Sequence, residues 1–107
     1  MNRISVITAT LNAEQTVADC IASVRAQAVP VEHIIVDGCS KDGTMAAIGR
    51  AAADSRDVTY LVSSEPDTGI YSAMNKGIAK ARGDIVGILN ADDVYADDDI
   101  LGTILAA

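Results

Sequence analysis

The fold class of this chain is indicated most clearly by Ile85-Val86-Gly87-Ile88-Leu89-Asn90-Ala91-Asp92-Asp93, an apolar run that ends abruptly in polar residues. Such a run is typical of a strand that is covered on both faces of a parallel sheet. The polar tetrapeptide then lies at the carboxyl edge of the sheet, where open α/β folds bind their ligands. Asp92 and Asp93 favour a hard divalent cation that also grips substrate phosphates. The alternative is that both carboxylates only cap a helix or solvate a turn.

Three further strand-like runs precede this stretch and alternate with helical patterns. Strands are expected over residues 4–8, 34–36 and 58–62, where β-branched side chains are frequent. Each is followed by apolar residues at helical spacing, and the three stripes are Val17, Cys20, Ile21 and Val24; Met45 and Ile48; and Ile70, Ala73, Met74, Gly77, Ile78 and Ala81. Strands and helices alternate about every 25 to 30 residues, which is the spacing of βαβ units. Residues 1–107 are therefore expected to form one α/β domain with a mostly parallel sheet.

Local signals predict where the helices begin and end. Asn12 is a favourable N-cap and Gln15 lies at the capping-box position, so the first helix is expected to start there and to be closed by Pro30. Arg82 and Gly83 are expected to end the third helix, as a cation and a C-cap glycine. The three aspartates at 97–99 are expected to open a short last helix.

The composition and the charge distribution argue against nucleic acid as a binding partner. The chain has 8 basic and 15 acidic side chains, and residues 84–107 hold 6 of the acidic ones and none of the basic ones. An acidic stretch repels a phosphate backbone unless a metal intervenes, and a chain without Phe or Trp offers little stacking surface for bases. Nucleic acid is therefore not expected as a partner.

The hydropathy pattern and the cysteine usage predict a cytoplasmic protein. No apolar stretch approaches the roughly 18 residues of a membrane span. Two cysteines make neither a disulfide framework nor a zinc ligand set, so Cys20 and Cys39 are expected to be free thiols. His33, the one histidine, has no neighbouring pattern of a catalytic base and is expected to have a surface or structural role.

The loops after the first, second and fourth strands are expected to meet at one edge. They contain residues 9–12, Asp37 with Gly38, and the tetrapeptide, and the loop at 66–69 can join them. Helix N-termini at this edge suit phosphate oxygens, whereas the carboxylates repel them, and a bridging cation resolves the conflict. Asp37 is placed to accept hydrogen bonds from a ribose or a nucleobase, or else is a simple turn residue. The glycine patterns of dinucleotide and P-loop sites are absent from the sequence.

Four motifs in order resemble family 2 of the nucleotide-sugar-dependent glycosyltransferases. Residues 5–12 and 36–44 resemble its first and second strand signatures, and residues 90–93 resemble its D-x-D motif. Residues 65–77 are similar to the branch that includes bacterial O-antigen and exopolysaccharide transferases. The resemblance covers nearly the whole chain and implies a three-layer α/β/α, Rossmann-like GT-A fold.

The resemblance also implies a reaction and its partners. The reaction is the inverting transfer of a sugar from a nucleoside diphosphate sugar. The expected donor is a UDP-sugar, and the expected cofactor is Mn2+ or Mg2+. The acceptor is a hydroxyl of a saccharide or lipid-linked saccharide in cell-surface polysaccharide synthesis, which allows peripheral membrane association of the full-length enzyme. By position, the resemblance assigns Ala9, Thr10, Glu14 and Asp37 to the nucleoside, Asp67 and Gly69 to the diphosphate-sugar pocket, and Asp92 and Asp93 to metal and sugar contacts.

The chain departs from the family pattern in ways that matter. Asn90 stands where an Asp is frequent, Gly38 replaces a second frequent Asp, and Ala9 replaces a frequent Pro. The acceptor-binding half and the general base of the family lie further along than Ala107, so no catalytic residue is assigned and a truncated chain or donor-binding fragment is expected. The alternatives are a non-catalytic module that self-associates through an exposed sheet edge and, more weakly, a nucleotidyltransferase.

Overall fold

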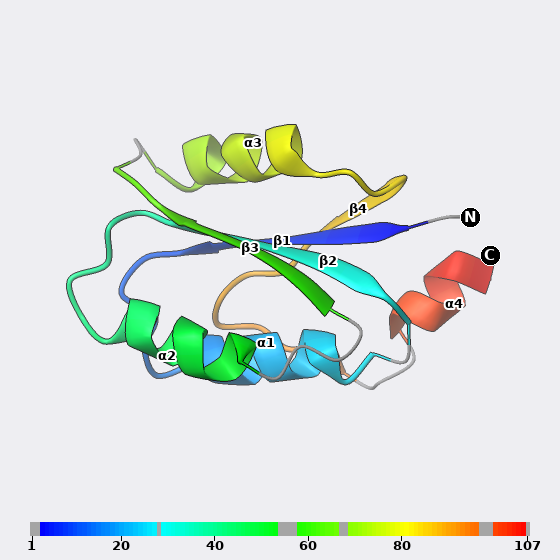
Figure 1. The fold of residues 1–107 in the computed structure, drawn as a ribbon, viewed down its shortest axis with the longest axis horizontal. Helices are drawn as coiled ribbons and strands as arrows, with labels where there is room; N and C mark the ends of the chain where they lie inside the picture. Colours follow the sequence, from blue (N-terminus) through cyan, green and yellow to red (C-terminus); the bar gives the residue numbers. More distant parts are fainter. Residues whose placement is uncertain (1–2, 28, 54–57, 67–68, 97–99, 107) are drawn as a thin grey trace.

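The computed structural model describes residues 3–27, 29–53, 58–66, 69–96 and 100–106. Strands and helices alternate along the chain, as predicted (Figure 1). The elements are β1 (Ile4–Thr10), α1 (Val17–Arg25), β2 (Val31–Asp37), α2 (Thr44–Ala52), β3 (Val58–Ser64), α3 (Ile70–Lys80), β4 (Ile85–Ile88) and α4 (Ile100–Ala106). None of the described helices is long and apolar enough to cross a membrane.

The four described strands form a parallel sheet in the order β3-β2-β1-β4. β1 pairs with β2 along all seven residues, whereas it pairs with β4 over Ile4–Ile7 only. The second and third strands thus add successively to one side of β1, and β4 then pairs with its other side. The strand order reverses between β1 and β4, and open α/β sheets bind ligands at such a reversal.

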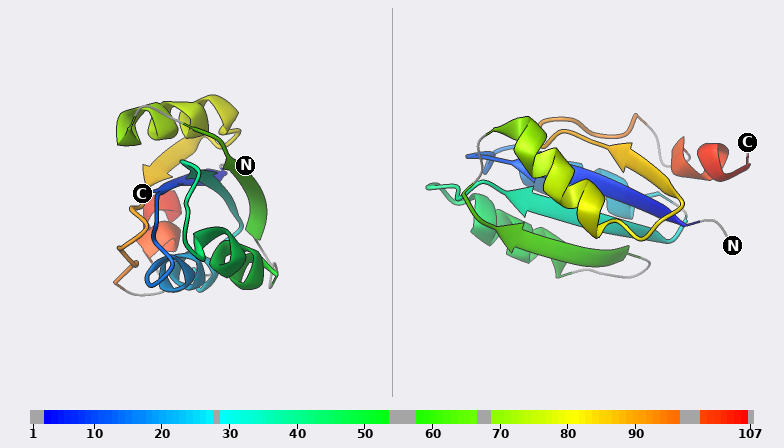
Figure 2. Two further views of the ribbon diagram at one scale, coloured as in Figure 1. Left: turned by 90° about the vertical axis from the view of Figure 1, so that its left-hand side faces the viewer. Right: turned by 90° about the horizontal axis from the view of Figure 1, so that it is seen from above.

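Helices cover the two faces of the sheet. α1 and α2 lie on one face and α3 lies on the other, over β1 and β2 (Figures 1 and 2). The α3 side is packed closely because Gly77 has no side chain: a Cβ there would lie 2.5 Å from Cγ2 of Ile7. On the other face, Leu101 of α4 joins the buried cluster that contains Val24 of α1. The predicted three-layer α/β/α architecture is confirmed.

β4 differs from its prediction. Its side chains alternate in exposure, and Val86 and Ile88 are 43% and 49% exposed. The expectation of a strand covered on both faces is wrong because β4 lies at the edge of the described sheet, beyond the part that α3 covers.

Both predicted boundaries of the first helix are also wrong. α1 begins at Val17, after Thr16, and ends at Arg25, well before Pro30. Asn12 is not its cap: it adopts a left-handed conformation with φ 50°, and its Oδ1 accepts a hydrogen bond from the Lys41 N–H at 2.8 Å. Asn12 therefore joins the loop after β1 to the loop after β2. The expected role of residues 97–99 lies outside the described residues.

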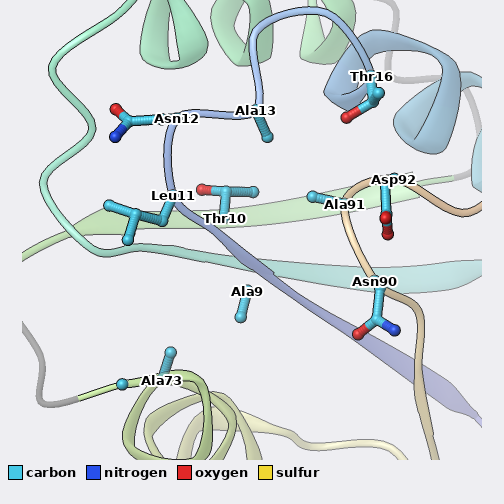
Figure 3. A pocket seen from close by; sticks show the side chains of 11 residues that line it. Ala9, Thr10, Leu11, Asn12, Ala13, Thr16, Ala73, Asn90, Ala91 and Asp92 are labelled. Atoms are coloured by element: carbon cyan, nitrogen blue, oxygen red, sulfur yellow. The ribbon is translucent and has the colours of Figure 1, made fainter.

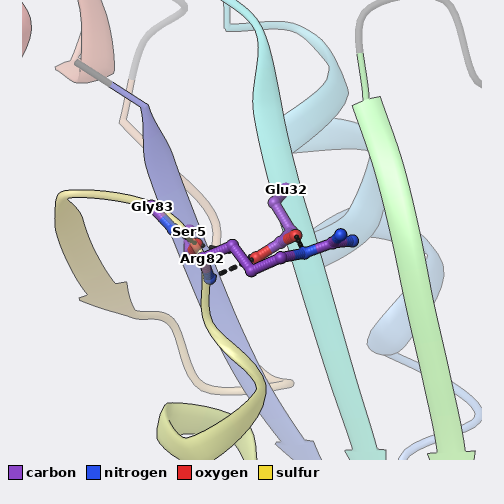
Figure 4. Close-up of polar contacts among 4 residues, drawn as sticks. All are labelled: Ser5, Glu32, Arg82 and Gly83. Atoms are coloured by element: carbon purple, nitrogen blue, oxygen red, sulfur yellow. Dashed lines mark hydrogen bonds and ion pairs between the residues drawn. The ribbon is translucent and has the colours of Figure 1, made fainter. Parts of the chain in front are cut away.

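The connection from α3 to β4 is held by a buried carboxylate rather than by a glycine cap. α3 ends at Lys80, and Ala81 is already extended. Glu32 of β2 accepts hydrogen bonds from the Ser5 hydroxyl at 2.9 Å and from the Arg82 N–H and Nε at 3.0 and 3.1 Å (Figure 4). Gly83 donates its N–H to Ser5 Oγ at 2.9 Å, and a Cβ on Gly83 would lie 2.7 Å from the Ser5 nitrogen. Close approach to β1, not helix capping, requires the glycine.

Candidate functional site

A pocket of about 520 Å³ opens at the carboxyl ends of β1 and β4 (Figure 3). It lies at the reversal of strand order, and its volume is within the roughly 300–1,000 Å³ of small-molecule sites. Three segments build it: the end of β1 with the loop that follows, the start of α3, and the loop after β4. The lining residues are Ala9, Thr10, Leu11, Asn12, Ala13, Thr16, Gly69, Ala73, Asn90, Ala91 and Asp92.

The pocket wall combines small residues with polar side chains. Five of the lining residues are alanine or glycine, which leaves room for a ligand close to the backbone. Asn90 and Asp92 project from the β4 loop, across the pocket from Asn12 (Figure 3). The beginning of α3 also reaches the pocket, and the free N–H groups of a helix start favour an anion. The pocket therefore offers a carboxylate and a helix N-terminus to one ligand.

Gly69 determines how α3 begins. Its φ of 137° and ψ of −179° lie in a region that is essentially restricted to glycine. Ala73 then donates its N–H to the Gly69 carbonyl at 3.2 Å in the first turn. The structure thus places Gly69 at the pocket. Asp67, its predicted neighbour in the site, lies outside the described residues.

Asp37 is fully buried at the end of β2, next to the pocket but not on its wall. Its carboxylate accepts hydrogen bonds from the hydroxyls of Thr10 at 2.7 Å and Ser64 at 2.9 Å, and from the Ser40 N–H at 2.8 Å and hydroxyl. Burial raises the pKa of Asp37, but these hydrogen bonds outweigh burial and hold it below its ordinary value. The ionised carboxylate thereby ties together the ends of β1, β2 and β3.

Glu14 faces away from the pocket, toward the start of α2. Its Oε2 accepts a hydrogen bond from the Gly43 N–H at 3.1 Å, and its own N–H donates to Asp42 at 3.4 Å. Of the residues predicted to bind the donor, the structure therefore brings Ala9, Thr10, Gly69 and Asp92 to one pocket. It places Asp37 and Glu14 behind the loops that form the wall.

The acidic motif is both a turn and part of the pocket. Asp93 donates its N–H to the Asn90 carbonyl at 3.0 Å and accepts a hydrogen bond from the Asn90 amide at 3.3 Å, which closes the turn. Asp92 lines the pocket and Asp93 does not. The described residues contain no group of three His, Cys, Asp or Glu side chains that could hold a metal alone. One or two carboxylates do suit an ion that completes its shell with water and substrate phosphates.

A line of buried polar side chains lies behind this motif. Thr8 Oγ1 is 2.8 Å from His33 Nε2 and 3.8 Å from Cys20 Sγ, and the Cys20 thiol donates to the Asn90 carbonyl at 3.5 Å. Burial lowers the pKa of His33 to about 4, so the ring is neutral near pH 7 and its role is structural. Burial, with Asp93 and Asp92 nearby, raises the pKa of Cys20 to about 11, so the thiol remains a donor. The sequence indicates only that Cys20 lies on an apolar helix face, because its polar partners lie on other elements.

Comparison with known proteins decides the family. The profile of glycosyl transferase family 2 matches residues 5–107, nearly the whole chain. The chain belongs to glycosyl transferase family 2. Both cysteines of this family 2 chain are free thiols, as expected.

The curated relatives are considerably longer than the chain. An uncharacterized glycosyltransferase of Mycobacterium tuberculosis is 36% identical over 106 residues, which are 97% of the family 2 chain and 39% of the relative. The putative teichuronic acid biosynthesis glycosyltransferase TuaG of Bacillus subtilis is 37% identical over 97 residues, which are 89% and 38% of the two proteins. The chain thus spans 38–39% of the length of these two relatives.

Solved structures share the fold. The mannosyltransferase PcManGT from Pyrobaculum calidifontis, in complex with GDP-Man and Mn2+, superposes with a TM-score of 0.90 at 29% identity, over 97% of the family 2 chain and 31% of that protein. Residues 1–349 of TarS from S. aureus, in complex with UDP-GlcNAc, give a TM-score of 0.87 at 25% identity, over 97% and 30%. The predicted GT-A fold is confirmed.

Proposed function

We propose that this chain is the donor-binding part of an inverting glycosyltransferase that takes a UDP-sugar together with Mn2+ or Mg2+. The pocket at the reversal between β1 and β4, with Asp92 on its wall, is the observation that carries the proposal. Membership of family 2 supports the reaction class, and the nucleotide-sugar and Mn2+ complexes of similar folds support the ligands. The names of relatives in teichuronic acid and succinoglycan synthesis support a saccharide or lipid-linked saccharide acceptor in cell-surface polysaccharide synthesis.

The pocket has a natural direction for such a donor. The nucleoside is proposed to lie against the small residues at the end of β1, Ala9 and the backbone of Thr10, because the Thr10 hydroxyl is already bonded to Asp37. The diphosphate is proposed to lie between the start of α3 at Gly69 and the carboxylate of Asp92, where positive helix charge and a shared cation meet. Asp67 is proposed for the same diphosphate-sugar end.

Asp37 and Glu14 act on the donor indirectly in this proposal. The Asp37 oxygens already accept bonds from three residues, so direct contact with a nucleobase requires one of those bonds to be exchanged. Glu14 is engaged with the start of α2. We propose that both residues position the loops that enclose the nucleoside.

The chemistry assigned to this part of the enzyme is stabilisation of the leaving group. Asp92 and Asp93 would hold the cation, with the uncharged amide oxygen of Asn90 beside them. The bound cation would neutralise the charge that grows on the departing diphosphate, which stabilises the transition state by several kcal/mol. The N–H groups at the start of α3 add hydrogen-bond donors for the same oxygens. The acceptor hydroxyl attacks the anomeric carbon from the opposite side, which inverts its configuration. None of the described residues is assigned as the general base for that attack.

Calorimetry with the 107-residue chain tests the proposal. UDP is expected to bind in the presence of Mn2+, and Asp92→Asn is expected to weaken binding at least tenfold because a charged ligand becomes an amide. Asp19→Asn provides a matched control, since Asp19 is an exposed aspartate of α1 outside the pocket. Absence of binding for UDP, GDP and dTDP with Mn2+ would refute the proposal.

A second candidate, a non-catalytic module that self-associates, rests on β4. Val86 and Ile88 are about half exposed on this edge strand, and Ile78 of α3 is 47% exposed. Exposed apolar edges favour pairing with another chain. Sedimentation separates the candidates: a monomer that binds nucleotide favours the transferase, and a concentration-dependent dimer that ignores nucleotide favours the module.

A further inference from the structure

Cys20 and Ser23 of α1, together with Gln27 two residues beyond its end, each bond to the main chain of the segment that follows β4. The Cys20 thiol donates to the Asn90 carbonyl at 3.5 Å. Ser23 Oγ accepts the Tyr95 N–H at 3.2 Å, and Gln27 Oε1 accepts the Leu101 N–H at 2.9 Å. Positions 20, 23 and 27 have the i, i+3, i+7 spacing of one helical face. We call these three residues the α1 polar row.

Two of the three side chains in the polar row are buried, and Ser23 is half-buried. Cys20 is fully buried and Gln27 is 4% exposed, beside Val24 in the core. Buried polar groups cost free energy unless they are hydrogen-bonded. The helix itself orients two of them: the Ser23 hydroxyl donates to the Cys20 carbonyl at 2.8 Å, and the Gln27 amide donates to the Ser23 carbonyl at 3.4 Å. Their acceptor oxygens remain directed at the segment after β4.

The main-chain groups that the row satisfies have no strand partner. Pairing between β1 and β4 ends with the Leu89 N–H, which donates to the Ile7 carbonyl at 3.0 Å. Tyr95 lies in the irregular segment that follows, and Leu101 is in the first turn of α4, where N–H groups lack a helical acceptor. Beyond the last hydrogen bond between β1 and β4, the α1 polar row thus holds the main chain that follows β4.

We propose that Cys20, Ser23 and Gln27 are positioning residues for the acidic motif, and that they hold Asp92 and Asp93 in register with the rest of the pocket. This inference rests on the proposed function, because it concerns how the same residues hold a cation. Asn90, whose carbonyl the row holds, lies two residues before Asp92, and the Tyr95 contact lies two residues after Asp93. Fixing the main chain on both sides of two ligands restricts where their carboxylates can lie.

Two variants remove the contacts without changing the pocket wall. Ser23→Ala removes the hydroxyl, and Gln27→Leu removes the acceptor while keeping a side chain of similar volume. Ile21→Val is the matched control on the same helix, since Ile21 is buried against the α2 side and belongs to a different cluster. Ser23→Thr keeps the hydroxyl and is the rescue variant.

The experiment combines amide hydrogen exchange with Mn2+ titration in the presence of UDP, using the 107-residue chain. Exchange of the Leu101 amide is expected to accelerate at least tenfold in Gln27→Leu, and that of Tyr95 in Ser23→Ala. Mn2+ affinity is expected to fall about tenfold in both, the lower end of what loss of an outer-shell contact causes. Ser23→Thr is expected to restore both readouts, and Ile21→Val is expected to leave both unchanged.

The possible failures are distinguishable. If wild type binds Mn2+ with UDP and both variants bind it equally well, the positioning role is wrong while the proposed function stands. If Ile21→Val loses as much affinity as the variants do, the effect is general destabilisation and the positioning role is again wrong. If wild type itself does not bind Mn2+, the proposed function fails. If amide exchange at Tyr95 and Leu101 is also unchanged in the variants, the claim that the polar row holds this segment is wrong as well.

Discussion

The two ends of β2 carry buried carboxylates that the protein satisfies in different ways. Glu32, near the amino end, is 5% exposed and is paired with the Arg82 guanidinium and the Ser5 hydroxyl. Asp37, at the carboxyl end, is fully buried, and its carboxylate accepts hydrogen bonds from three hydroxyls and one backbone N–H of the described residues. At both ends burial raises the pKa but hydrogen bonds lower it further, so both side chains are ionised near pH 7.

The difference lies in what each carboxylate holds. Glu32 closes the corner between α3 and β4, where none of the residues that line the candidate site lies. Asp37 joins three strand ends whose loops include the wall of the candidate site. A buried, ionised carboxylate therefore does not mark a ligand site by itself. The pocket, the start of α3 and Asp92 distinguish the carboxyl end.

The largest expected effect is that of Asp37→Ala. It leaves the donors of Thr10, Ser40 and Ser64 without their acceptor, and each unsatisfied buried donor costs about 1–3 kcal/mol. We expect a loss of about 4 kcal/mol or more in the free energy of unfolding, measured in urea. A loss no greater than that of Glu32→Ala would show that the two ends are equivalent.

Acid should weaken the middle of β2 before either end. The folded-state pKa of His33, about 4, is below its ordinary value, so the unfolded chain binds the proton first and stability is lost as pH falls from about 6.5 toward 4. The full shift corresponds to roughly 3 kcal/mol. Glu32 and Asp37 have lowered pKa values, so their contribution is present above the unfolded values near 4 and is lost only below them. Urea titrations of His33→Gln should be flat between pH 6.5 and 4.5; a slope equal to that of wild type contradicts this assignment.

Glu32→Gln tests the cation-paired end with a smaller change. The variant keeps the shape and one acceptor oxygen but loses the charge that Arg82 and Ser5 stabilise. Because the Arg82 side chain is 66% exposed, we expect a loss of only about 1–2 kcal/mol. UDP affinity should be unchanged, since this corner is remote from the pocket wall. A reduced UDP affinity at unchanged stability would contradict this expectation and show that both ends of β2 affect UDP binding.

A glycine pair gives the smallest effect and isolates the pocket. Gly69→Ala forces a side chain into φ 137°, and we expect a cost of about 1–2 kcal/mol together with weaker UDP binding. Gly49→Ala is the control: a Cβ there meets nothing within 4 Å, so helix propensity should stabilise α2 by up to about 1 kcal/mol. Thermal unfolding and calorimetry measure both. Equal affinity in the two variants would remove Gly69 from the site.

The elements of the fold could be predicted because their signals are local. The apolar runs and helical stripes lie within single segments, and the observed β1, β2 and β3 contain the predicted strands. The exposure of β4 could not be predicted, because it depends on strand order. Asn12 was misassigned because its partner, the N–H of Lys41, is 29 residues away, and the bond from Arg82 to Glu32 spans 50 residues.

For the same reason, only some of the residues that the sequence predicts for the site line the pocket. Gly69 and Asp92 follow or precede recognisable elements, and the parallel sheet brings those ends together. Asp37 has the right chemistry and the right edge, but its depth depends on hydroxyls from two other strands and a loop. The Cys20, Ser23 and Gln27 contacts could not be foreseen, because their partners are main-chain groups of the irregular segment after β4 and of the first turn of α4, far away in the sequence.

The most direct test of the central claim is to map UDP onto the chain by amide chemical shifts in the presence of Mg2+. We expect the shifts to concentrate in residues 9–13, at Gly69 and in residues 90–92, and we expect Asp92→Asn to abolish them. The structure also has a second hollow, of about 380 Å³, beside Leu61, Lys80 and Arg82 on the α3 face, which serves as the internal comparison. Shifts that concentrate at this second hollow, or that persist in Asp92→Asn, would contradict a donor site at the carboxyl edge of β1 and β4.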